Sequence, residues 1–224
     1  MDLQTRDSVF AEMHDATDRA LWDGLPELSA REKTLLCLVA DVCQQTLGTP
    51  FEQHVRMAYK HGLSPDDLRE LLRFISYDSG YPAAAVALER LVAIEGDLGV
   101  VPTGAGHAVN ADGTGSPLPE ALLQTVRRLD EGFADYMTLQ SRMRAGMQML
   151  SVRERAFATM TVDVLFQTLS ESFHTHVGRA LGAGATPEDV RAVVRFSALF
   201  GMTKAWRALN VLDELLKESE TAAA

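Results

Sequence analysis

Two histidines at matching helical positions are the side chains best suited to chemistry. His54 lies among Phe51, Val55, Ala58 and Tyr59, which recur at helical spacing, so its imidazole shares the apolar face of a predicted helix. His176 occupies the same place in a second, similar segment. An imidazole facing an interior or a pocket can transfer protons near neutral pH. A buried structural histidine bonded to a backbone carbonyl is the alternative interpretation, and both stay open.

An internal duplication makes the two histidines equivalent. When the chain is shifted by 122 residues, 19 of the 49 positions from Leu28 to Ser76 are identical without a gap. One residue then drops out, so that Gly80 matches Gly201. A match of this length indicates two copies of one unit. We predict a first unit over residues 1–98, a linker rich in glycine and small residues over 99–117, and a second unit over 118–224.

Each copy is predicted to be entirely helical. Capping boxes open a long apolar stretch at Ser29-x-x-Glu32 and again at Ser151-x-x-Glu154, and capping is sufficient to explain both glutamates. Gly62 is placed where a helix ends, and Ser64 with the following proline and aspartates starts another helix. Because no segment alternates with period two over the length of a strand, we predict an all-α fold.

Two aspartates inside apolar helices are harder to assign. Asp41 and Asp163 match between the copies, and each could accept a hydrogen bond from a histidine or pair with an arginine. We favour the pairing with Arg73 and Arg195, which would be structural.

A helix break in the first copy supplies candidate substrate contacts. Tyr77 and Tyr81 flank Gly80, and we expect them close to His54, because helix breaks often border pockets. The matching residues of the second copy are apolar, which indicates that the two copies differ in their pockets. We also predict that His174 and Trp206 contact the substrate.

Composition excludes several classes of protein. A formal net charge of −10 and a pI near 5.0 disfavour nucleic acid and anionic membranes as partners. The two cysteines, Cys37 and Cys43, are too few for a disulfide framework or a zinc site. His174 and His176 lie about 200 degrees apart on a helix, so they cannot bind one metal ion together, and no metal is expected. Because neither a signal peptide nor an apolar run of about 18 residues is found, we expect a cytoplasmic protein.

The order of these motifs resembles the carboxymuconolactone decarboxylase family, whose members have the alkylhydroperoxidase-D-like fold. The resemblance rests on Leu-Ser-x-Arg-Glu, His-Val-x-x-Ala-x-x-x-Gly, Ser/Thr-Pro-Asp/Glu-Asp and Gly-Tyr-Pro-Ala-Ala-Ala. It implies two tandem units that form a pseudo-dimer, and a homotrimer of such chains. Peroxidase members carry Cys-x-x-Cys ahead of the histidine, where this chain has Leu47 and Pro50, so thiol-based peroxide reduction is excluded. The histidine of decarboxylase-type members maps to His54 and His176.

The function we expect is a cofactor-independent lyase or isomerase acting on a small carboxylated or enolisable ring, such as a lactone or a polyketide-like compound. His54 would be the acid/base, Tyr77 or Tyr81 would stabilise an enolate, and His176 would serve a second pocket. The alternative is a non-catalytic ligand-binding or scaffold protein that kept the fold.

Overall fold

The computed structural model describes residues 3–104, 109, 112 and 118–223, with side chains described as far as residue 218. Most of the expected linker, including the Ala105-Gly106 pair of its glycine-rich stretch, lies outside them. These described residues form helices and no strand, as the all-α prediction requires. The helices are α1 (Ser8–Asp18), η1 (Arg19–Asp23), α2 (Ala30–Gln44), α3 (Thr49–Lys60), α4 (Pro65–Ser79), α5 (Tyr81–Leu98), α6 (Glu120–Leu129), α7 (Glu131–Ala145), α8 (Val152–Phe166), α9 (Glu171–Gly182), α10 (Pro187–Ser197), η2 (Ala198–Phe200) and α11 (Met202–Ala223).

The predicted helix starts are confirmed in both copies. Ser29 opens α2 and Ser151 opens α8, each with its glutamate returning a bond to the cap backbone. Complete capping boxes also open α4 at Ser64 and α10 at Thr186, each followed by a proline in the first turn. Because each cap satisfies backbone groups that would otherwise be unpaired, the repeated motifs produce the same helix order twice.

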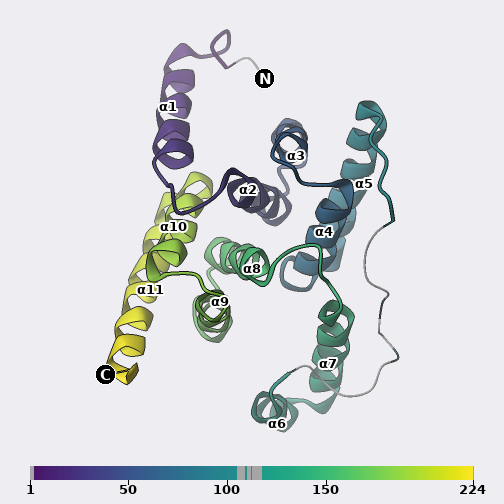
Figure 1. Ribbon diagram of the computed structural model, residues 1–224, viewed down its shortest axis with the longest axis vertical. Coiled ribbons are helices and arrows are strands. Elements are labelled where there is room, and N and C mark those ends of the chain that lie inside the picture. The colour runs from purple at the N-terminus through teal and green to yellow at the C-terminus, as the bar shows by residue number, and fades with distance from the viewer. Residues whose placement is uncertain (1–2, 105–108, 110–111, 113–117, 224) are drawn as a thin grey trace.

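Helices α2 and α8 pack against each other at the centre of the molecule (Figure 1). At their N-termini the two capping glutamates form reciprocal ion pairs. Arg31 Nε lies 2.6 Å from Glu154 Oε1, and Arg153 Nε lies 2.7 Å from Glu32 Oε1. This exchange is the pattern of a pseudo-twofold axis between the copies, so both glutamates join the copies as well as capping their helices.

Each hydrophobic core takes residues from both copies. Leu25 and Leu28, which precede α2, are buried in the cluster built mainly from α8 to α11. Met147 and Leu150, which precede α8, are buried in the cluster built mainly from α2 to α5. Helices α4 and α7 are accordingly in contact. The segment ahead of each copy therefore helps to build the environment of the other copy.

Candidate active site

The last turn of α2 and the first half of α3 bring Asp41 and His54 together. His54 Nδ1–H donates to Asp41 Oδ2 at 2.5 Å, and the aspartate is 2% exposed. Helix α2 ends at Gln45, whose φ of 58° is left-handed and turns the chain so that α3 can pack back against α2. Because the buried carboxylate engages Nδ1, Nε2 is the ring nitrogen left to meet a ligand.

Thr46 completes the arrangement around the carboxylate. Its hydroxyl donates to Asp41 Oδ1 at 2.6 Å, so each carboxylate oxygen accepts one side-chain hydrogen bond. The backbone N–H of Thr46 also donates to the carbonyl of Asp41 at 3.0 Å, which holds the threonine next to the aspartate. A carboxylate held at both oxygens keeps the imidazole in one tautomer and one orientation.

The second copy contains the same triad. His176 Nδ1–H donates to Asp163 Oδ2 at 2.6 Å, and Thr168 donates to Asp163 Oδ1 at 2.7 Å. Gln167 again ends its helix with a left-handed φ, of 61°. Both aspartates therefore bind histidines, and the arginine pairing that we favoured from the sequence is wrong.

The two arginines lie elsewhere. Arg195 pairs with Glu188 and with Glu27, and Arg73 is exposed on α4. The Asp41 carboxylate already accepts hydrogen bonds from Thr46 and His54. It therefore has hydrogen-bond partners without an arginine.

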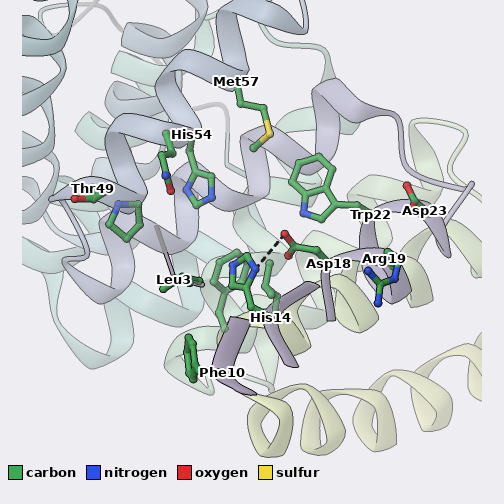
Figure 2. Close-up of a pocket in the computed structure, with 14 residues that line it drawn as sticks. Leu3, Phe10, His14, Asp18, Arg19, Trp22, Asp23, Thr49, His54 and Met57 are labelled. Carbon is green, nitrogen blue, oxygen red and sulfur yellow. Dashed lines mark ion pairs between the residues drawn. The ribbon is translucent and has the colours of Figure 1, made fainter. Parts of the chain in front are cut away.

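His54 opens into a cavity of about 670 Å³ between α3, the N-terminal segment and η2 (Figure 2). Apolar and aromatic side chains supply much of its lining, and polar groups stand at intervals among them. The apolar lining residues are Leu3, Phe10, Trp22, Pro50, Met57, Leu199 and Phe200, and the polar ones besides His54 are His14, Asp18, Arg19, Asp23, Thr49 and Gln53.

The surroundings of His176 have a different character. Its side chain is 10% exposed, against 19% for His54. Position 144 matches position 22 under the 122-residue shift, and Arg144 packs on Phe74 as Trp22 packs on Phe196. An aromatic wall in one copy is therefore replaced by a cation in the other.

An ionic cluster lies beside His176. Arg144 lies 3.3 Å from Asp78 and sits 3.9 Å above the ring of Tyr77. Burial raises the pKa of Asp78, with Arg144 and His176 opposing the shift, and burial lowers the pKa of Arg144. Asp78 and Tyr77 match Phe200 and Leu199 of the His54 cavity, so the second site contains charges where the first contains hydrocarbon.

A family model of the carboxymuconolactone decarboxylase family matches residues 9–93 and again residues 131–214. The chain belongs to the carboxymuconolactone decarboxylase family. A solved structure from Burkholderia xenovorans LB400, named as a gamma-carboxymuconolactone decarboxylase subunit, is similar in fold, with a TM-score of 0.57 and 19% sequence identity. That similarity covers 97% of this chain and 90% of the other. No curated protein gives a significant match.

The thiol chemistry used by peroxidase members of the family has no counterpart at this site. Cys37 is fully buried, and burial raises the pKa of its thiol well above the ordinary value. Burial likewise raises the pKa of Cys43 to about 12. Both thiols are therefore protonated at neutral pH and make poor nucleophiles.

None of the four predicted substrate contacts lines the His54 cavity. We expected Tyr77 and Tyr81 close to His54, but neither lines its cavity, and the Tyr81 hydroxyl donates to Gln140 Oε1 at 2.7 Å. The two copies pack across the pseudo-twofold, so the helix break of one copy reaches the histidine of the other. His174 is exposed on α9, and Trp206 is 67% exposed on α11.

The sequence contained a signal for the residues that were missed. Asp-x-x-x-Gln-Thr occurs at Asp41 and again at Asp163, followed by the histidine at the same distance. A polar pattern kept across two otherwise divergent copies is what a hydrogen-bonded triad produces. The N-terminal contributions, His14 and Trp22 among them, carried no such signal, because neither is repeated in the second copy.

Two absences concern the part of the chain that the structure describes. No group of three or more His, Cys, Asp or Glu side chains there is arranged to hold a metal ion. None of the helices that the structure describes combines the length and the apolar character that crossing a bilayer requires.

Proposed function

We propose that this chain is a cofactor-independent lyase or isomerase that transfers a proton to or from carbon in a small carboxylated or enolisable ring compound. The observation that carries the proposal is the Asp41–His54 pair: a short, buried hydrogen bond at Nδ1, with the opposite edge of the imidazole in a mostly apolar cavity. This is the arrangement of a general base or acid whose orientation is fixed in advance.

The chemistry follows from that orientation. With Nδ1–H bound to Asp41, Nε2 of His54 can accept a proton from a carbon next to a carbonyl, and the C–H electron pair moves onto the carbonyl oxygen. In a decarboxylation the C–CO₂ bond breaks instead and its electrons form the same enolate. The imidazolium form of His54 then donates its proton to carbon and takes up another from solvent. In both cases the negative charge develops on a ring substituent within the cavity.

The cavity walls favour a flat ring with one anionic group. Phe10, Trp22 and Phe200 supply aromatic surfaces, which pack well on planar rings. Arg19 makes no ion pair among the described residues and lies on the cavity lining, where it is available to a substrate carboxylate. A non-catalytic ligand-binding protein would need the cavity but no oriented imidazole, and a scaffold would need neither.

Turnover of two ring acids tests the proposal. The probes are gamma-carboxymuconolactone, the lactone in the family's name, and 2-oxocyclohexanecarboxylate, a ring β-keto acid, with CO₂ release as the readout. We expect at least one to be decarboxylated, and His54→Gln to lower that rate on the order of 10²-fold or more with little change in melting temperature. The matched variant His176→Gln should retain most of the rate. Equal losses in the two variants, or none in either, would contradict a reaction centred on His54.

For the assembly we propose a homotrimer of these fused pairs. Exposed apolar side chains on α5, among them Val86 and Val92, and Met202 and Trp206 on α11 support it, because such surfaces are commonly buried between subunits. Light scattering at micromolar concentration should give three times the chain mass, and a monomer would contradict the proposal.

A further inference from the structure

The N-terminal helix brings a second imidazole to the cavity. His14 on α1 lines the same cavity as His54, and Figure 2 shows the two rings reaching it from different helices, α1 and α3. Nδ1 of His14 lies 3.6 Å from Asp18 Oδ2 and 3.7 Å from Asp15 Oδ1. The cavity is therefore lined by two histidines, each with a carboxylate beside its Nδ1.

The two pairs differ in rigidity. Asp41 and His54 form a short hydrogen bond in a buried place, whereas the contact from His14 to Asp18 is too long for one and its side chain is 46% exposed. Ala11 is the one buried residue of α1, so this helix is held by few buried contacts. Catalytic hydrogen bonds are often long before a ligand is bound, which a loosely packed helix permits.

This second imidazole belongs to the His54 cavity alone. Under the 122-residue shift, position 14 matches Tyr136 and position 18 matches Gln140, and neither can act as a cationic donor. Gln140 instead accepts the hydroxyl of Tyr81. The duplication thus carried the Asp–His pair into both copies, while the histidine on α1 occurs at the one site that opens into the cavity.

We propose that His14 is a second catalytic group, which binds the oxygen that becomes negative while His54 moves the proton at carbon; this rests on the proposed function. In its imidazolium form His14 donates from both ring nitrogens, one to Asp18 and one to the substrate oxygen. As the C–H or C–CO₂ electron pair moves onto that oxygen, the N–H of His14 stabilises the enolate. No oxidant or reductant takes part.

Binding of p-nitrophenolate tests this role without a known substrate, because the probe is a flat ring that carries an oxyanion. Nitrobenzene is the matched ligand that lacks the oxyanion. We expect His14→Leu to weaken p-nitrophenolate binding at least tenfold and nitrobenzene binding less than twofold. His61→Leu, at the end of α3 and outside the cavity lining, serves as the control and should bind both ligands as the wild type does.

Two further measurements separate this inference from the proposed function. On a probe that turns over, His14→Leu should lower kcat about 10²-fold, the effect of losing one oxyanion donor, at an unchanged melting temperature. If His54→Gln stops turnover while His14→Leu binds p-nitrophenolate normally, the inference is wrong and the proposed function stands. If His54→Gln leaves turnover unchanged while His14→Leu loses p-nitrophenolate selectively, the oxyanion site stands and the proposed function fails. Equal loss of both ligands in His14→Leu, or no p-nitrophenolate binding by the wild type at millimolar concentration, would overturn the inference.

Discussion

The His54 site and the His176 site contain the same three side chains in the same geometry, yet they border different spaces. His54 faces a cavity of about 670 Å³ with aromatic walls, whereas His176 lies beside an ion pair between Arg144 and Asp78. The triad is therefore not enough to define a reaction site. What stands opposite the imidazole decides whether a substrate can reach it.

The difference arises from segments that lie outside the most similar part of the repeats. Trp22 and Arg144 occupy matching positions ahead of the two copies, and Phe200 and Asp78 match near the two helix breaks. In each pair one residue is apolar and the other charged. Divergence at these few positions gives the two histidines different surroundings while the duplicated framework is kept.

The largest expected difference between the sites is the response to Asp→Asn substitution. An amide carries no charge and has one acceptor oxygen, so Asp41→Asn can no longer accept from both Thr46 and His54. We expect turnover of the ring-acid probes to fall about 10²-fold in Asp41→Asn, because the imidazole loses its fixed tautomer. Asp163→Asn should cost stability, and its rate should stay within about threefold of the wild type.

Steady-state turnover rates and the free energies of urea unfolding, measured for both variants, test this difference. A rate loss in Asp163→Asn as large as that in Asp41→Asn would show that both sites react, and the contrast drawn between them would be wrong.

Removal of the cation at the His176 site is expected to give the next largest effect. Arg144→Met leaves Asp78 desolvated without its partner, and we expect a loss of about 2 kcal/mol in the free energy of unfolding. Adding Asp78→Leu should restore at least half of that loss, since the double variant contains no unpaired charge. Urea denaturation measures both steps. If the double variant is no more stable than Arg144→Met, the loss does not come from an unpaired Asp78 carboxylate.

Substitution of the threonine that bonds to each aspartate should give a smaller effect in both copies. Thr46→Val and Thr168→Val each remove one hydrogen bond to a carboxylate, which should cost about 1 kcal/mol of stability in either copy. Turnover should fall a few-fold in Thr46→Val alone, because only there does the aspartate orient a reacting imidazole. Thermal melts and rates of the two variants, measured side by side, give the result, and a rate loss in Thr168→Val would contradict it.

The smallest effect concerns how the Asp78 carboxyl beside His176 makes stability depend on pH. Burial raises the pKa of Asp78 above its ordinary value of 3.8, so the folded protein holds a proton that the unfolded chain has lost. The stability of the wild type relative to Asp78→Asn should therefore be greatest below about pH 4 and should decrease as the pH rises through the raised pKa. Urea unfolding of both proteins between pH 3.5 and 7 measures the difference, and a constant difference would contradict the shift.

The sequence predicted the framework well, for physical reasons that are local. Capping boxes at Ser29 and Ser151 and the proline-led starts after Ser64 and Thr186 satisfy the backbone within four residues, so they can be recognised without knowledge of the packing. The 122-residue register then predicted the same helix order twice.

Local sequence rules could not predict which side chains from different helices meet at each histidine. Periodicity placed Asp41 and His54 on apolar faces but did not show that the left-handed turn at Gln45 brings those faces together. From the helix break we expected Tyr77 near the histidine of its own copy, whereas packing across the pseudo-twofold places Leu199 of the other copy there. A helical pattern specifies which face is buried, and the partner of that face is set by the tertiary arrangement.

The exchange of the segments ahead of each copy has a consequence for the history of the molecule. Leu25 and Met147 each complete the core of the opposite copy, as the corresponding segments would in a pair of separate, identical chains. In such a pair a single gene specifies both halves, and every substitution appears twice. Once the halves are joined, each position can change alone. Fusion therefore permits one half to specialise for a substrate while the other becomes a scaffold, which symmetric subunits cannot do.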